Sequence, residues 1–253
     1  MSGVTPPDLR DVFDPGRERR ARLARRFYEE VTVRPDDRGH AVLLDDRELK
    51  SPARSALRLP TAAAAGLLAA EWQAQDDRID PATMPVTRMV WTGLDRIAPD
   101  PAPAVAELVG FAGSDLVCYR ADAPADLSAR QAAAWDPLLD WLAAETGARL
   151  SVTSGIVHVA QDAAALQRLE AGLDGMAPVR MAALHTAVVL TGSFVIGLAL
   201  ERGHLEVPAA WAAARIDETF QEEQWGVDRE AEARAAGRVG ELQSAAALLR
   251  ALD

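Results

Sequence analysis

The sequence predicts an α+β fold, in which a small antiparallel β-rich domain is followed by a larger helical domain. Short β-branched or alternating runs, separated by turn-forming residues, fill the first third of the chain. Alanine-rich segments of helical periodicity fill the remainder. Because 49% of the 253 residues are hydrophobic, the chain can bury a sizeable core. We place a charged arm at 1–25, the β-rich domain at 26–84 and the helical domain at 85–253.

The β-rich domain is expected to be an antiparallel meander. Turn-forming residues such as Gly39 and the pair Asp45 and Asp46 separate its runs. After the last strand, Thr61 can cap a helix that extends to about residue 75. The predicted strands cover residues 30–34, 40–44, 48–50 and 55–59.

Helical periodicity dominates the larger domain. One β-like interruption at 149–159, RLSVTSGIVHV, predicts a short strand pair packed against the helices. The predicted helices cover residues 86–97, 102–111, 127–145, 163–173, 179–200, 208–224 and 229–252.

Charge and cysteine content narrow the classes of partner. The 27 Lys and Arg against 38 Asp and Glu leave a net charge of -11, which opposes binding to nucleic acid and to anionic membranes. The basic cluster at 17–26 is interpreted as the solvated face of a short helix over 15–27. A single Cys118 and an acidic N-terminus without an apolar signal core indicate a reducing, cytoplasmic location.

The most apolar run, 181–200, approaches the ~20 residues that cross a bilayer. Polar residues such as His185 and Thr191 interrupt it, and Gly192 and Gly197 lower its hydrophobicity. We therefore expect a helix buried on nearly all sides and no membrane insertion.

Spacings that enzyme chemistry requires are missing from the sequence. It contains no phosphate-binding glycine loop, no zinc-binding histidine pair and no cysteine pair. We expect no catalytic residue, no cofactor and no metal. The alternative is an enzyme with a dispersed active site around Cys118, Tyr119 and His185, although a buried, inert thiol is the favoured interpretation of Cys118. A second alternative is a nucleic-acid or membrane adaptor that uses the basic arm.

An ordered series of motifs is more specific than any one of them. Taken together, the motifs resemble the family of ATP synthase alpha-subunit assembly chaperones of mitochondria and alphaproteobacteria. The resemblance covers nearly everything from Arg26 onward. Where the family commonly has glycine and threonine, this chain has Asp46 and Ser51, and both preserve a turn. The motifs are RFYEEVTV from Arg26, LLDDRELKSP from Leu43, LPTAAAAGLLAAEWQAQDDRIDPATMPVTRMVWTGLDR from Leu59, DLVCYRADAP from Asp115, WDPLLDW from Trp135 and EEQWGVDREA from Glu222.

The resemblance implies a chaperone that is not an enzyme. Its client would be the unassembled alpha subunit of the F-type ATP synthase, and the beta subunit would later replace the chaperone at the same interface. The free chaperone is expected to be monomeric. Family resemblance makes an acidic residue near Glu241 a candidate client contact, with an ordinary solvated carboxylate as the alternative. Most of the six tryptophans are expected in the core, with one or two left for a partner. Trp225 and Gly226 are interpreted as a helix-ending turn whose indole packs between domains. The full set of candidate partner-binding residues is Glu241, Trp225, Glu222, Glu223 and Trp72.

Overall fold

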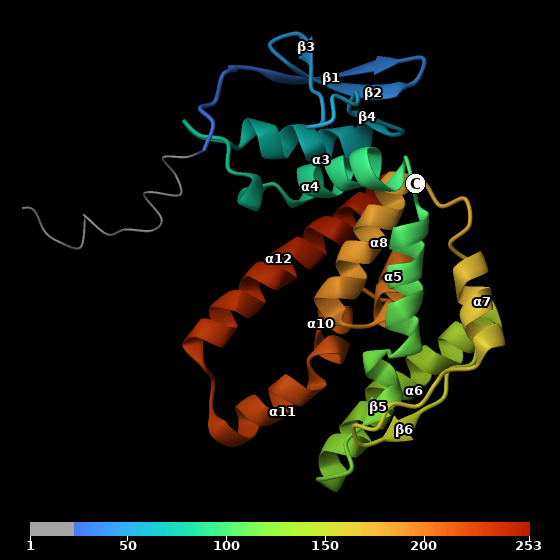
Figure 1. Ribbon diagram of the computed structural model, residues 1–253. Helices are drawn as coiled ribbons and strands as arrows, with labels where there is room; N and C mark the ends of the chain where they lie inside the picture. Colours follow the sequence, from blue (N-terminus) through green and yellow to red (C-terminus); the bar gives the residue numbers. More distant parts are fainter. Residues whose placement is uncertain (1–22) are drawn as a thin grey trace, which may run out of the picture.

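The computed structural model describes residues 23–253, and the predicted α+β fold is confirmed (Figure 1). A small sheet lies at one end, two helices lie beneath it, and the remaining helices extend away from it. The strands are Val31–Asp36 (β1), Gly39–Leu44 (β2), Arg47–Glu48 (β3), Arg58–Leu59 (β4), Tyr119–Arg120 (β5) and Thr153–Ser154 (β6).

The helices occupy most of the rest of the chain. They are Ala62–Gln73 (α3), Pro85–Thr92 (α4), Ala102–Gly113 (α5), Ala125–Thr146 (α6), Ala163–Ala171 (α7), Pro178–Thr191 (α8), Phe194–Glu201 (α9), Val207–Ala214 (α10), Ile216–Trp225 (α11) and Arg229–Ala251 (α12). Shorter turns lie at Pro81–Thr83 (η1), Gly93–Ile97 (η2) and Leu116–Cys118 (η3).

Strand β2 is the centre of the N-terminal sheet. It pairs antiparallel with β1, β3 and β4, and Val42, on β2, is fully buried. The turn into β3 places Asp45 and Asp46 in the left-handed region, at φ values of 48° and 66°. The Asp45 carboxylate accepts hydrogen bonds from the backbone N–H groups of Glu29 and Glu30, at 3.0 and 2.9 Å. Because aspartate tolerates this backbone conformation and stabilises turns locally, the expected turn forms without glycine.

Helix α3 packs beneath the sheet and begins at the capping residue that the sequence predicts. The Thr61 side chain accepts a hydrogen bond from the Ala64 N–H at 3.1 Å. Trp72, at the other end of the helix, lies in a cluster of aromatic rings with Tyr28 and Trp91. The Tyr28 hydroxyl donates a hydrogen bond to the Trp72 carbonyl at 2.6 Å. These contacts fix the helix against the sheet.

A half-buried carboxylate joins α3 to α4. Glu71 accepts hydrogen bonds from the N–H groups of Val86 and Thr87, each at 2.7 Å, and from the Thr87 hydroxyl at 2.8 Å. Two of these donors belong to the first turn of α4, where backbone N–H groups have no partner within the helix. Glu71 therefore caps the next helix along the chain.

Two predicted helices are each divided in the structure. The expected helix over 179–200 breaks at Gly192, which takes a left-handed φ of 70°, and Ser193 caps the new helix α9 through the Ile196 N–H. The expected helix over 208–224 breaks at Arg215 into α10 and α11. In both cases a continuous apolar or alanine-rich pattern hides the turn.

The predicted strand pair within 149–159 is also wrong. Thr153–Ser154 instead pairs in parallel with Tyr119–Arg120, a segment thirty residues or more away in the chain. Within the described residues, no helix is long and apolar enough to cross a membrane. The predicted helix over 15–27 falls largely outside residues 23–253, and residues 23–27 are not helical. The proposed domain boundaries stay a prediction.

Helix α12 is packed over only part of its length. Its C-terminal part lies against α8, α4 and α3, and the Thr61 hydroxyl donates to the Ala251 carbonyl. In its first half, residues 229–240, no residue is buried. Figure 1 shows this half diverging from the body toward α11. The buried residues of the second half are Leu242, Ala245, Ala246, Leu248 and Leu249.

Candidate functional site

The turn between α11 and α12 presents an exposed tryptophan. Trp225 ends α11 with 80% of its surface exposed, and Val227 in the turn is 58% exposed. Gly226 between them has a φ of 88°, which a residue with a Cβ rarely adopts. A large indole that is held outward on a helix-ending turn offers contact area to a partner. The expectation that Trp225 packs between domains is wrong.

The same region is strongly acidic. Residues 217–232 contain seven Asp or Glu and one Arg. Two of the acids form ion pairs. Glu222 pairs with Arg215, at the start of α11, at 2.6 Å, and Glu223 pairs with Arg130 of α6 at 2.7 Å. We call residues 215–240 the acidic hairpin. Its charge favours a partner surface that carries lysine or arginine.

A cleft of about 660 Å³ lies between the acidic hairpin and the body. Its lining combines apolar side chains, carboxylates from α11, and arginines from α12 and from the start of α11. The lining includes Leu116, Leu190, Trp211, Asp217, Glu218, Ala231, Arg234, Ala235 and Arg238.

Arg238 links the exposed half of α12 to the body across this cleft. Its guanidinium donates a hydrogen bond to the Leu190 carbonyl, near the end of α8, at 2.7 Å. It also lies 5.9 Å from the Trp211 ring centroid, and Arg215 lies 5.6 Å from the same centroid. Sequence reasoning missed this arrangement. The spacing of Trp211 and Arg215 on neighbouring helical turns was a signal, whereas nothing local marks Arg238.

Two of the predicted partner-binding residues lie outside the acidic hairpin. Glu241 pairs with Arg88 of α4 at 2.7 Å and is about one-third exposed. Trp72 is buried in the aromatic cluster beneath the sheet, so it offers no surface to a partner. The structure thus brings Glu222, Glu223 and Trp225 together on one helix and places Glu241 and Trp72 elsewhere.

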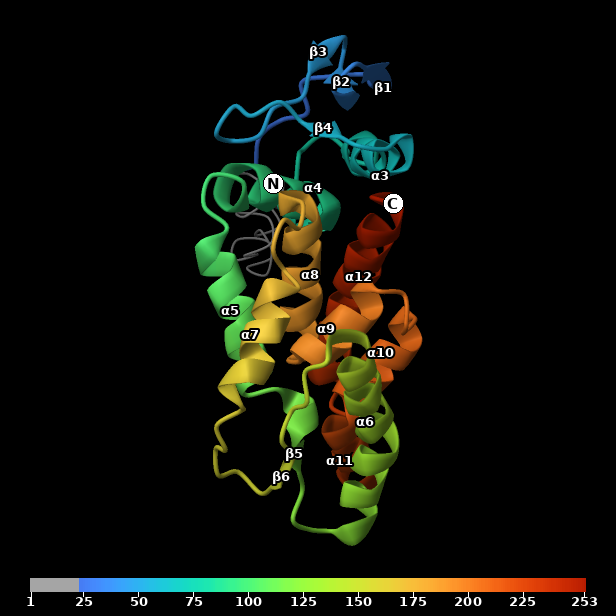
Figure 2. The same ribbon diagram turned by 90° about the vertical axis from the view of Figure 1, so that its right-hand side faces the viewer.

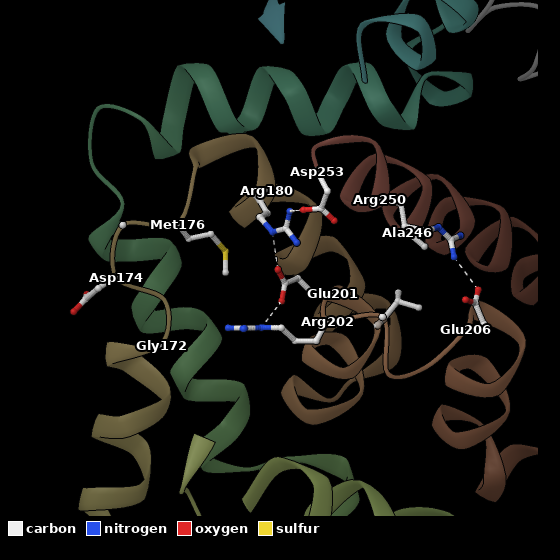
Figure 3. Close-up of a pocket in the computed structure, with 13 residues that line it drawn as sticks. Gly172, Asp174, Met176, Arg180, Glu201, Arg202, Glu206, Ala246, Arg250 and Asp253 are labelled. Atoms are coloured by element: carbon white, nitrogen blue, oxygen red, sulfur yellow. Dashed lines mark hydrogen bonds and ion pairs between the residues drawn. The ribbon is translucent and has the colours of Figure 1, made fainter. Parts of the chain in front are cut away.

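A second pocket, of about 480 Å³, lies where α8, α9 and the C-terminus meet (Figure 3). Glu201, almost fully buried, pairs with Arg180 at 2.6 Å and with Arg202 at 3.0 Å. Arg180 also pairs with the side chain of Asp253 at 2.6 Å. Since these charges neutralise one another, we interpret the pocket as a set of ion pairs that fixes the end of α12.

The residues of the enzyme alternative do not come together. His185 on α8 pairs with Glu107 of α5 at 3.0 Å, whereas the Tyr119 hydroxyl lies 3.0 Å from His158 Nδ1. Cys118 is fully buried, and desolvation, together with the nearby Asp115 carboxylate, raises the pKa of its thiol to about 12. Such a thiol is not a nucleophile at neutral pH. Within residues 23–253, no group of His, Cys, Asp and Glu could hold a metal ion.

Asp115 joins the segment that leads into β5 to helix α9. Its carboxylate accepts hydrogen bonds from the N–H groups of Val117 at 3.1 Å and Val195 at 3.0 Å. Complete burial raises the pKa of Asp115 to about 6, although these hydrogen bonds oppose the shift. Asp115 is therefore an anchor within the core, not an accessible site.

Comparison with known proteins identifies relatives. A model of the family described as ATP12 chaperone protein matches residues 25–143. The crystal structure of Atp12 from Paracoccus denitrificans is 43% identical, with a TM-score of 0.84, and the match covers 91% of this chain and 99% of that one. The Atu1473 protein from Agrobacterium tumefaciens is 40% identical, with a TM-score of 0.87 and coverages of 95% and 92%. Protein atp12, mitochondrial, from Schizosaccharomyces pombe is 24% identical over an alignment of 219 residues, and the match covers 80% of this chain and 74% of that protein.

Proposed function

The chain belongs to the family of ATP12 chaperone proteins, and we propose that it assists assembly of the catalytic head of F-type ATP synthase by holding the free alpha subunit. In this proposal the chain shields the surface of the alpha subunit that later contacts the beta subunit. The beta subunit then replaces the chaperone by competing for that surface, and no nucleotide hydrolysis is required.

The exposed Trp225 is the observation that carries the proposed client contact. An unassembled subunit of a ring leaves a large apolar interface in water, which associates wrongly unless another protein covers it. A tryptophan that is 80% exposed at a helix end can insert into such an interface. Tryptophan is also among the residues that most often dominate binding energies at protein interfaces.

Charge on the acidic hairpin gives the proposed contact its orientation. Glu222 and Glu223 lie within one helical turn of Trp225 and are held by arginines of this chain. Their carboxylates keep free lone pairs toward solvent, so each can accept a further hydrogen bond from a basic group of the client. Complementary charge of this kind mainly raises the rate of association and fixes the register.

A binding assay with the purified alpha subunit tests the proposal. Trp225→Ser should weaken binding about tenfold or more, because it removes a large exposed apolar contact. The matched control is Val189→Ser, which changes another exposed apolar residue, located on α8. Melting temperatures of all three proteins should agree. If the unmodified chain does not bind the alpha subunit, or does not improve its yield in soluble form, the proposed function is wrong.

Glu223→Gln tests the electrostatic part separately. We expect slower association and a weaker dependence of the rate on salt, with little change in dissociation. Glu241→Gln is the comparison variant, because Glu241 is the third acidic residue predicted to contact the client. Since Glu241 is engaged with Arg88, equal loss of binding in both variants would place the client contact along the whole of α12 instead of at the hairpin turn.

A further inference from the structure

The loop over residues 151–160, SVTSGIVHVA, exposes aliphatic side chains and contains no charged residue. Ile156 is 100% exposed and Val157 is 73% exposed, and Val152 and Val159 are partly exposed. Exposed apolar side chains that cluster in this way mark a surface that another molecule covers. The acidic hairpin does not include this loop.

Hydrogen bonds hold the loop in a defined shape. At its base, the Gln161 side chain donates to the Ser151 carbonyl at 3.0 Å and accepts from the Ser151 N–H at 2.6 Å. Further along the loop, the Gly155 N–H donates a hydrogen bond to the Arg120 carbonyl at 2.8 Å. The loop is therefore arranged before any partner binds, which reduces the entropy lost on binding.

One side of the loop backbone is unpaired. Strand β6 bonds to β5 alone. In the part of the chain that the structure describes, residues 156–160 make no hydrogen bond from backbone to backbone. Free N–H and C=O groups beside exposed Ile and Val side chains are the features of an edge to which an extended segment can add as a new strand.

Three carboxylates, those of Asp122, Asp136 and Asp140, lie near this edge. The Asp122 carboxylate lies against Gly155, so close that a Cβ there would be 2.7 Å from its Oδ2 atom. A groove of about 340 Å³ beside Val152 is lined by Asp136 and Asp140 of α6 and also by Arg149. Asp136 pairs with Arg120, whereas Asp122 and Asp140 form no ion pair with any described residue. This charge favours a basic segment and disfavours a second copy of the chain, which carries the same acids and a net charge of -11.

From these features we infer that the loop over 151–160 is a second client contact, which receives an extended apolar segment with an adjacent basic residue by strand addition. The inference rests on the proposed function. Main-chain hydrogen bonds to the loop supply affinity, apolar side chains pack on Ile156 and Val157, and the basic residue contacts Asp122 or Asp140. Together with Trp225, the loop would hold the client at two separate places.

The direct test is the double variant Ile156→Ser, Val157→Ser, measured for binding to the purified alpha subunit. We expect binding weaker by about tenfold and an unchanged melting temperature, because both side chains are exposed. Val189→Ser is again the matched control. If the unmodified chain binds and the double variant binds equally well, the inference is wrong. If the unmodified chain fails to bind, the proposed function fails instead.

Hydrogen exchange distinguishes strand addition from side-chain contact alone. Amides of residues 156–160 should exchange more slowly when the alpha subunit is bound, and Val157→Pro, which removes one donor, should weaken binding. Unchanged exchange at these amides would overturn strand addition. The occupant would instead be a second copy if the molar mass of the unmodified chain rose with concentration and the double variant abolished that rise, and this result would also overturn the inference.

Discussion

The two ends of the molecule differ in how far their apolar side chains are exposed to solvent. Beneath the sheet, the aromatic rings are packed together and the Glu71 carboxylate is surrounded by donors. Toward the opposite end, in the lower half of Figures 1 and 2, lie the loop over 151–160 and the acidic hairpin. Among the described residues, these two segments hold six of the eight exposed large hydrophobic side chains, namely Val152, Ile156, Val157, Val159, Trp225 and Val227.

This difference separates stability from binding. At the sheet end, Phe27 is an exposed large hydrophobic side chain, and the aromatic cluster beneath the sheet is buried. Changes to the buried residues there should lower the free energy of unfolding without altering the affinity of the folded protein. Changes at the loop end should lower the affinity and leave the free energy of unfolding unchanged, because those side chains are already in water. Altered affinity in the Glu71 or Gly93 variants would break the comparison, and the three predictions that follow them sharpen it.

The largest expected effect is that of Glu71→Ala. It leaves the Val86 and Thr87 N–H groups without their acceptor at the start of α4. The loss should be about 3 kcal/mol of unfolding free energy, which corresponds to a fall in melting temperature of about 6–12 °C. Thermal unfolding measures it. Glu71→Gln retains one acceptor oxygen and should lose less, and equal losses in the two variants would contradict this account.

Gly93→Ala should destabilise by about 2 kcal/mol through overpacking. A Cβ at this position would lie 2.7 Å from Val179 Cα and 2.9 Å from the Pro178 carbonyl oxygen, and backbone atoms cannot move aside cheaply. The matched control is Gly66→Ala in α3, where a Cβ meets nothing within 4 Å. That control should gain about 0.5–1 kcal/mol because alanine favours the helix. Chemical denaturation of both variants checks the contrast in sign.

The buried Asp115 carboxylate should make the stability of the protein depend on pH. Burial raises the pKa of Asp115 to about 6, so its contribution to stability is complete below pH ~4 and is lost as pH rises through 6. The stability difference between the unmodified chain and Asp115→Asn should therefore shrink by about 1 kcal/mol between pH 5 and pH 7. Denaturation at a series of pH values measures it.

Asp95 provides a control, because its pKa is shifted in the direction opposite to that of Asp115. Desolvation would raise the pKa of Asp95, but hydrogen bonds from the Ser51 hydroxyl and the Ala53 N–H outweigh it and lower that pKa. Its contribution is present above the ordinary aspartate pKa and is lost as pH falls. Asp95→Asn should thus differ most from the unmodified chain at neutral pH. A difference that moved with pH in the same direction for both variants would refute this assignment.

The smallest expected effect concerns the ion pair between Arg88 and Glu241. Both side chains are partly exposed, so a double-mutant cycle with Arg88→Ala and Glu241→Ala should give a coupling energy of about 0.5 kcal/mol. High salt should reduce it further. A coupling of several kcal/mol would mean that this pair is a main tie between α4 and α12, and that α12 belongs with the sheet end.

Features that depend on neighbouring residues could be predicted from the sequence. Thr61 caps α3 as expected, and Asp45 and Asp46 form the turn between β2 and β3. The four strands of the N-terminal sheet and the general positions of the helices follow the same local signals. In each case the residues that specify the structure lie within a few positions of it.

Features that depend on distant residues could not be predicted. The partner of β6 is β5, more than thirty residues earlier, and no pattern within either segment specifies the other. The Arg238 hydrogen bond to the Leu190 carbonyl is equally non-local. Exposure was also hard to judge, since hydrophobicity alone favours a buried Trp225. The breaks at Gly192 and Arg215 were missed because helical sequence continues on both sides of each.

The turn at Gly192 has a consequence for how this chain covers its own most apolar stretch. It folds the most apolar stretch of the sequence back on itself, so close that a Cβ at Gly197 would lie 2.5 Å from Val188 Cγ2. The two arms therefore cover part of one another. Contacts between residues close in sequence thus contribute to burying this stretch, and a later segment of the chain, α12, packs against both arms.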